Sequence, residues 1–186
     1  MPTPEVTFLD ADQARDNSVV DELVHIVNSA YALGEAGLWQ EGAMRTGPAE
    51  IAEAIRSGGL LGAALDGRLV GCAYVHPLDA QTADLGLVST APDRWGNGIG
   101  RALVRTAEDL MHQRGVMTMQ LEVLVPKGWE HPGKRRLQDW YIQLGYQVIR
   151  TERFDQVAAH LEDQLSTPCE FRIFRKALAR DRVGSN

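Results

Sequence analysis

The sequence predicts a mixed α/β or α+β fold, in which one central sheet is flanked by helices. Segments with the apolar period of amphipathic helices are interspersed with segments that alternate like strands, in the order β-α-α-β-β-β-α-β-α-β-α-β. A glycine-rich turn at 96–100 joins one of these strands to the helix that follows. The 186 residues contain no linker or repeat. We therefore expect one domain over 1–178 and a frayed polar tail at 179–186.

The N-terminal half is expected to hold two helices and a hairpin. The first helix follows from the helical rhythm of apolar residues between Ser18, its expected N-cap, and Tyr31. Pro48 suits the first turn of the second helix. Asp66-Gly67 is the strongest short hairpin signal, so the flanking runs are expected to pair. These elements are the strand 5–9, the helices 18–31 and 48–57, the strands 60–65, 68–76 and 83–90, and a loop or broken helix over 34–45.

The C-terminal half is expected to alternate helix and strand. Gly115 is the expected stop of the helix that opens at the glycine-rich turn. The strand after it alternates cleanly, with Met119 and Leu121 on one face and Gln120 and Glu122 on the other. These elements are the helices 98–114, 134–144 and 156–165 and the strands 116–125, 146–154 and 170–174.

Composition excludes several classes of protein. Hydrophobic residues make up 44% and charged residues 24%, as in soluble globular domains. A net charge of −6 gives no basic patch for nucleic acid, and no apolar run approaches the ~20 residues of a membrane span. The N-terminus lacks a signal-peptide layout, so a cytoplasmic protein is expected. Cys72 and Cys169 have no motif or zinc spacing, which predicts buried thiols and no metal site.

The most informative segment is the glycine-rich turn, with Gly96, Gly98 and Gly100 between a strand and a helix. Glycines let a backbone approach a ligand closely. The first amides of a helix have no internal partner, and the helix dipole is positive at that end. Together these features predict an anion site, most naturally for phosphate. The spacing fits neither the dinucleotide fingerprint nor a Walker A loop, because the third glycine comes one residue early and no Lys-Ser/Thr pair follows.

The turn resembles the acyl-coenzyme A signature of the GNAT superfamily of N-acetyltransferases, Gln/Arg-x-x-Gly-x-Gly/Ala. Gly98 and Gly100 match it, and Trp95 stands where Gln or Arg is usual. A second stretch, 137–146, is similar to the family's second motif, a helix with Tyr141 followed by Leu-Gly-Tyr. The resemblance covers most of the chain. It implies a mixed, mostly antiparallel sheet of about seven strands, splayed between strands four and five, with coenzyme A in the gap.

The resemblance implies acetyl-CoA as cosubstrate and no metal. Lys134 stands where the family often carries an Asn, and Tyr141 lies on the same expected helix. The implied coenzyme-binding residues are Val88, Ser89, Thr90, Trp95, Gly96, Asn97, Gly98, Ile99, Gly100, Arg101, Lys134 and Tyr141.

The implied reaction is acetyl transfer to a primary amine through a tetrahedral intermediate. An alkyl ammonium has a pKa of about 10.4, so freeing the amine at neutral pH costs roughly 4–5 kcal/mol. A carboxylate can receive that proton. Asp84 falls by register where some members carry a base, on a face expected to include Gly86, Val88 and Thr90, and Glu122 is the second candidate. Either carboxylate can instead be a solvated strand residue.

The resemblance assigns two further roles in the reaction. The family's oxyanion donor, a backbone amide at the end of strand four, maps to 88–90. Tyr141 matches the family's general acid, which protonates the leaving thiolate. On sequence alone Tyr141 can also be a core residue, because it shares an apolar stripe with Leu137 and Leu144.

The acceptor site is expected in the region that lines the acceptor cleft in this family. Glu41 can hold a second ammonium there, and Arg45 a carboxylate or phosphate. The same region can equally be a surface loop, and His131 is expected to be a loop residue. The helix 156–165 can border the acceptor site or form a dimer contact. The implied acceptor residues are Tyr31, Trp39, Glu41 and Arg45.

The implied partner is a small-molecule or peptide amine, bound by a monomer or homodimer that contacts neither nucleic acid nor membrane. Two alternatives stay open. One is a non-catalytic acyl-CoA-binding or regulatory module, which needs the glycine turn but not Tyr141 or Asp84. The other is acyl transfer to a hydroxyl or aminoglycoside-type acceptor.

Overall fold

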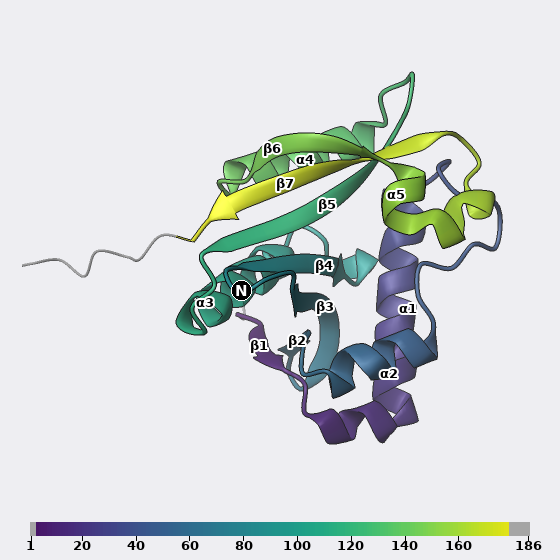
Figure 1. The fold of residues 1–186 in the computed structure, drawn as a ribbon. Coiled ribbons are helices and arrows are strands. Elements are labelled where there is room, and N and C mark those ends of the chain that lie inside the picture. Colours follow the sequence, from purple (N-terminus) through teal and green to yellow (C-terminus); the bar gives the residue numbers. More distant parts are fainter. Residues whose placement is uncertain (1–2, 179–186) are drawn as a thin grey trace, which may run out of the picture.

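The structure, a computed structural model, describes residues 3–178, which form one mixed sheet with helices against it (Figure 1). The sheet order is β1-β2-β3-β4-β5-β7-β6, and every neighbouring pair is antiparallel except β4–β5. The predicted seven-stranded, mostly antiparallel sheet is therefore confirmed. Its strands are β1 (Glu5–Phe8), β2 (Leu60–Leu65), β3 (Arg68–Pro77), β4 (Thr82–Thr90), β5 (Thr118–Pro126), β6 (Gln147–Arg153) and β7 (Cys169–Ala177).

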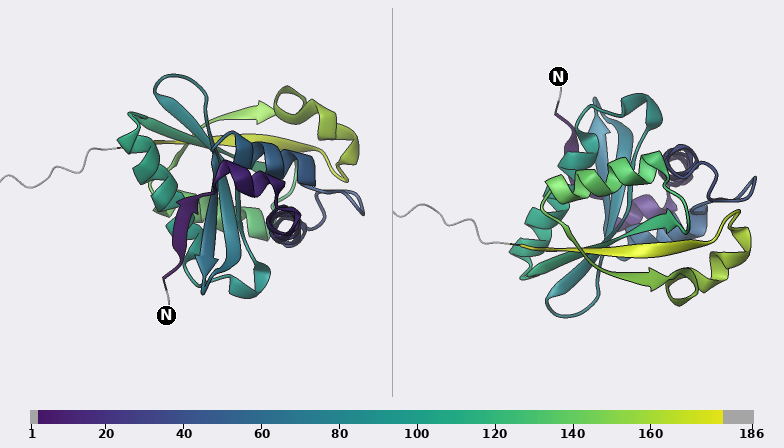
Figure 2. Two further views of the ribbon diagram at one scale, coloured as in Figure 1. Left: turned by 90° about the horizontal axis from the view of Figure 1, so that it is seen from below. Right: turned by 90° about the horizontal axis from the view of Figure 1, so that it is seen from above.

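The helices cover the sheet through separate hydrophobic clusters. In the left view of Figure 2, β2 and β3 stand between α3 and α1. The largest cluster joins α3 and α4 to one face of the sheet, and a second joins α1 and α2 to the other face. A third, smaller cluster lies under α5. The helices are α1 (Asn17–Gly34), α2 (Pro48–Arg56), α3 (Ile99–Gln113), α4 (Pro132–Gln143) and α5 (Phe154–Ala158), with 3-10 segments η1 (Ala11–Arg15), η2 (Pro92–Arg94) and η3 (Ala159–Gln164).

Local signals placed most N-terminal elements correctly, but the first cap was wrong. Asp16, not Ser18, caps α1, because its carboxylate accepts hydrogen bonds from the Ser18 amide at 2.9 Å and the Ser18 hydroxyl at 2.7 Å. The helix also continues beyond the predicted end at Tyr31, to Gly34. The hairpin turn is confirmed: Asp66 and Gly67 have φ of +50° and +75°, the pair of positive values that a type I′ turn needs.

The C-terminal elements differ more from prediction. The helix expected at 134 begins at Pro132, because the Nδ1 atom of His131 accepts a hydrogen bond from the Lys134 amide at 3.2 Å. His131, expected in a loop, is thus an N-cap. The helix expected over 156–165 is the short α5 followed by η3. The last strand extends to Ala177, which pairs with Thr118 at the start of β5. The expected tail at 179–186 lies outside the described residues.

The predicted splay between strands four and five is confirmed. β4 and β5 pair only at Thr82–Asp84 with Thr118–Gln120. Beyond Asp84 each strand keeps its other neighbour, β3 or β7, and the two diverge (Figure 1). The edge of β4 from 85 to 90 therefore has no strand partner on the β5 side.

A bulge in β4 changes which residues share a face. Cys72 pairs with Ser89 and Tyr74 with Gly86, so β4 has one extra residue there, and Leu87 has a φ of +51°. The bulge inverts the alternation of side chains. Leu87 packs with the α1–α2 cluster, and Val88 packs with the α3–α4 cluster.

The prediction that Asp84 shares a face with Gly86, Val88 and Thr90 is therefore wrong for the last two. The bulge turns Val88 to the α3 side. Thr90 lies there as well, since its hydroxyl oxygen is 3.8 Å from a Cβ placed on Gly100 of α3. Asp84 keeps Gly86 as its neighbour on the opposite face, where a Cβ on Gly86 would lie 3.9 Å from Asp84 Oδ2.

Candidate active site

The glycine-rich turn presents free backbone donors at the start of α3. Gly96 and Gly98 have φ of +82° and +80°, which only glycine adopts without strain, and a Cβ on either would meet nothing within 4 Å. The turn is therefore both open and dependent on glycine. Within 95–101, the backbone amides that donate no hydrogen bond to a described residue are those of Gly96, Gly98, Ile99, Gly100 and Arg101.

Trp95 braces this turn rather than reaching away from it. Its indole Nε1 donates to the Thr90 carbonyl at 2.8 Å, while half of the residue stays exposed. The departure from the family signature thus ties the turn to the end of β4. On the other side, a Cβ on Gly100 would lie 3.6 Å from the Trp140 ring, an ordinary contact that links α4 to the first turn of α3.

The remaining predicted coenzyme residues contribute differently. Ile99 is buried in the core, so only its backbone faces the turn. Ser89 is buried at the end of β4, and its hydroxyl has no hydrogen-bond partner among the described residues. Arg101 and Asn97 are exposed. The Asn97 amide makes a long contact, 3.4 Å, with the Arg94 carbonyl.

Tyr141 is buried, and its hydroxyl makes no hydrogen bond with a described residue. Its ring packs against Trp140, Tyr146 and Phe174, with centroids 4.8, 5.7 and 6.2 Å away. Burial raises the pKa of Tyr141 well above its usual value, and the phenol of Tyr31 raises it further. The hydroxyl therefore keeps its proton at neutral pH.

Asp84 and Glu122 lie on the sheet face opposite α3, beside the point where β4 and β5 part. Burial raises the pKa of Asp84 to about 6, and its Oδ1 is buried with no hydrogen-bond partner in the described chain. Loss of water around its carboxyl raises the pKa of Glu122 to about 7, with Asp84 and Glu152 adding to the effect. His76 pairs with Asp84 across β3 and β4, and its Nδ1 is also buried without a partner. Both carboxyls can therefore take up a proton near neutral pH.

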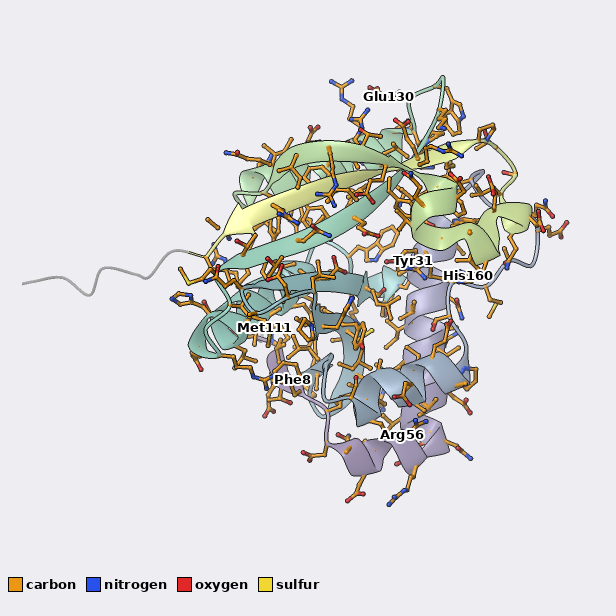
Figure 3. The ribbon with its side chains drawn as sticks, viewed as in Figure 1. Phe8, Tyr31, Arg56, Met111, Glu130 and His160 are labelled. Atoms are coloured by element: carbon orange, nitrogen blue, oxygen red, sulfur yellow. The ribbon has the colours of Figure 1, made fainter. Side chains whose placement is uncertain are left out.

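Three of the four predicted acceptor residues meet in one pocket between α1, the loop after it and η3. Tyr31, Trp39 and Arg45 line it, and the Arg45 guanidinium lies over the Tyr31 ring, 5.0 Å from its centroid. Glu41 is exposed and does not line this pocket, so its role at the acceptor stays a prediction. Leu161 of η3 lines the same pocket (Figure 3 labels the neighbouring His160), so part of the segment expected as the helix 156–165 borders this pocket.

Sequence reasoning missed Glu35, which ends α1 beneath this pocket. Its buried carboxylate forms an ion pair with Lys134 of α4 and accepts a hydrogen bond from the Trp39 indole. No local pattern marks the pair, because its members are 99 residues apart. Lys134 was expected at the coenzyme, and its ammonium group instead contacts Glu35. A coenzyme role for Lys134 stays a prediction.

No helix within 3–178 is long and apolar enough to cross a membrane. Within the same range, no three His, Cys, Asp or Glu side chains gather as ligands for a metal ion.

Solved structures with the same fold include three N-acetyltransferases. The ribosomal-protein-S18-alanine N-acetyltransferase from Escherichia coli has 16% identity and a TM-score of 0.66, covering 98% of this chain and 100% of its own. An aminoglycoside 6′-N-acetyltransferase complexed with coenzyme A has 16% identity and a TM-score of 0.69, covering 95% and 98%. The PaiA N-acetyltransferase from Thermoplasma acidophilum, in complex with coenzyme A, has 18% identity and a TM-score of 0.67, covering 95% and 99%.

Sequence comparisons give the family itself. No curated protein sequence matches the chain significantly. The model of the acetyltransferase (GNAT) family matches residues 21–128, which is more than half of the chain and includes the glycine-rich turn, Asp84 and Glu122. This chain therefore belongs to the acetyltransferase (GNAT) family and is an acyltransferase.

Proposed function

We propose that this chain is an N-acetyltransferase, which moves the acetyl group of acetyl-CoA to a primary amine of a small molecule or peptide. The observation that carries the proposal is the set of unpaired amides at the start of α3, beside the end of β4, whose edge from 85 to 90 has no strand partner on the β5 side. N–H groups at a helix N-terminus suit a diphosphate. The open space beside Gly96 and Gly98 lets one approach. Two solved relatives bound to coenzyme A support the same ligand.

The chain's own groups account for each proton in the reaction. Bound acetyl-CoA supplies an activated thioester carbonyl. The acceptor nitrogen attacks the carbonyl carbon, and Asp84 or Glu122 takes its proton, directly or through water. Backbone amides at 88–90, on the free edge of β4, donate to the oxyanion that forms. When the carbon–sulfur bond breaks, the thiolate takes the proton of the Tyr141 hydroxyl.

A thiol-release screen with acetyl-CoA tests this proposal. The acceptors are amino acids, polyamines, aminoglycosides, simple alcohols and peptide N-termini, with product masses to locate the acetyl group. Acetylation of an amine supports the proposal. Calorimetric binding of acetyl-CoA with no release across the panel contradicts it and favours a non-catalytic acyl-CoA-binding module. Acetylation of the alcohols alone favours transfer to a hydroxyl.

Gly98→Val is expected to weaken acetyl-CoA binding by at least about tenfold, roughly 1.4 kcal/mol. A branched side chain at a φ of +80° strains the turn and fills the space into which the amides point. Calorimetry gives the affinity. The matched control is Gly115→Val, at the other end of α3, where φ is +89° and the space is equally open. Equal affinities in the two variants would show that strain alone, not the phosphate site, explains any loss.

The pH profile of kcat/KM is expected to rise between about pH 6 and 7. The base must be ionised to accept a proton, and the two candidate carboxyls have pKa values raised to about 6 for Asp84 and about 7 for Glu122. Below this range both are protonated and transfer slows. If Asp84 is the base, Glu122→Gln is expected to keep the rise of kcat/KM near pH 6, and Asp84→Asn is expected to abolish it. A profile that neither substitution moves excludes both residues as the base.

Stability gives an independent check on the Asp84 assignment. The folded pKa of about 6 lies above the ordinary 3.8, so the folded state favours the protonated carboxyl of Asp84. The contribution of this group to the free energy of unfolding is therefore fully present below about pH 4 and is lost as pH rises through 6. Asp84→Asn is expected to flatten the fall in unfolding free energy over that window, measured by urea titration. An unchanged slope would show that Asp84 is ordinarily solvated.

A further inference from the structure

The pocket beside the proposed reaction centre carries one positive charge that the protein does not neutralise. We propose that Arg45 recognises a carboxylate of the acceptor, so that the substrate class is a small amino acid rather than a plain amine or polyamine. This inference rests on the proposed function and names the acceptor of that same site. It stands on the charge, rigidity, size and position of the pocket.

Arg45 carries the charge on the pocket wall that no ion pair within 3–178 neutralises. Two charged side chains line the pocket, Glu35 and Arg45. The Glu35 carboxylate already holds the Lys134 ammonium and the Trp39 indole. No salt bridge joins Arg45 to an acid anywhere in residues 3–178. The pocket therefore presents a net positive charge, which attracts an anion and disfavours a polyamine.

Arg45 is held in place on both sides. Its backbone amide donates to the Asn28 side chain at 2.8 Å, and the Thr46 amide donates to the same oxygen at 3.1 Å. The Asn28 amide group in turn donates to the Thr46 carbonyl at 3.0 Å. The guanidinium lies over the Tyr31 ring. A guanidinium fixed in this way can offer two parallel N–H groups to a carboxylate, which is a strong and geometrically specific contact.

Size and charge favour a small carboxylate over a phosphate or a macromolecule. The pocket encloses about 170 Å³ and is lined on its apolar side by Trp39, Met44 and Leu161. One guanidinium matches one negative charge, whereas a phosphate monoester, with nearly two negative charges at neutral pH, lacks a second cation here. The nearby cation, Lys134, is buried in its pair with Glu35. A free amino acid with an apolar side chain fits these conditions.

Glu35 connects this pocket to the proposed reaction centre. It lines the pocket and forms an ion pair with Lys134 of α4, the helix that also carries Tyr141. Figure 3 shows Tyr31 on α1 near the end of β4, below the segment that bears His160. The α-amine of an amino acid is two bonds from its carboxylate carbon, so an acid bound at Arg45 presents its amine beside Tyr31 in the same pocket.

The test compares L-amino acids with their carboxamides, which keep the amine and side chain and lose only the carboxylate. In the unaltered enzyme kcat/KM for the better acids is expected to exceed that for the matched amides by about tenfold or more. Arg45→Gln is expected to remove this preference with no change in the KM for acetyl-CoA. The matched control, Arg56→Gln, removes an exposed arginine of α2 and is expected to keep the preference for acids over amides.

Binding measured without turnover separates this inference from the proposed function. Amino acids are titrated into the enzyme by calorimetry, with Arg45→Gln alongside. Arg45-dependent binding without thiol release contradicts the proposed transfer and supports the carboxylate site. Turnover of amines with equal rates for acids and amides supports the transfer and overturns the carboxylate site. The absence of Arg45-dependent binding by every acid in the panel also overturns it.

Discussion

Replacing Lys134 by methionine is expected to lower the free energy of unfolding by about 3–5 kcal/mol, because it leaves the Glu35 carboxylate buried and unpaired. Both side chains are almost fully buried, and the pair joins the end of α1 to the first turn of α4. In a domain of this size the loss corresponds to a fall in melting temperature of roughly 6–20 °C. Urea titration and thermal unfolding measure it.

Two further variants separate the pair from its individual members. The double variant Glu35→Gln/Lys134→Met removes both charges and keeps a hydrogen-bond acceptor for Trp39, so it is expected to recover most of the lost stability. Arg135→Met removes the neighbouring cation of α4, which like its partner Glu130 is exposed, and is expected to leave the free energy of unfolding nearly unchanged. If Lys134→Met is no less stable than Arg135→Met, the pair does not hold α1 to α4.

The elements that could be predicted from the sequence are those with local signals. The Asp66-Gly67 turn, the stop at Gly115 and the helix that starts at Pro48 each depend on a few adjacent residues, and each lies where expected. The free amides of the glycine-rich turn belong to the same class, because the helix N-terminus and its glycines are contiguous. The splay of the sheet came from the resemblance and not from periodicity.

The features that escaped prediction depend on segments far apart in the chain. β7 lies between β5 and β6, which no local pattern specifies. The bulge at Leu87 places a non-glycine residue at a positive φ, between the pairs that β4 forms with β3 and against the α1–α2 cluster. The Glu35–Lys134 pair forms between elements that meet only in the folded state. Charge and burial at the site are therefore tertiary properties. The sequence offered Arg45 as a ligand for a carboxylate or phosphate, and the structure adds that Arg45 forms no ion pair within 3–178, because the Glu35 carboxylate in the same pocket is paired with Lys134.

Tyr141→Phe is expected to lower kcat by about 10²–10⁴-fold, the usual contribution of a positioned acid or base. The substitution keeps the ring that packs on Trp140, Tyr146 and Phe174, so stability and acetyl-CoA affinity are expected to stay unchanged. The hydroxyl has no hydrogen-bond partner in the described chain to lose. Steady-state kinetics on an identified acceptor, with calorimetry for the coenzyme, checks both expectations.

Tyr146→Phe is the matched control, because it removes the same hydroxyl from the adjacent ring. Tyr146 is also buried, and its hydroxyl is likewise without a partner among residues 3–178, but it belongs to the core behind Tyr141. Burial raises the pKa of Tyr141 far above neutrality, so its proton is available throughout the working pH range and the deficit should not vary with pH. A deficit equal in both variants would assign the loss to packing. A deficit confined to Tyr141→Phe assigns it to the proton that the leaving thiolate requires.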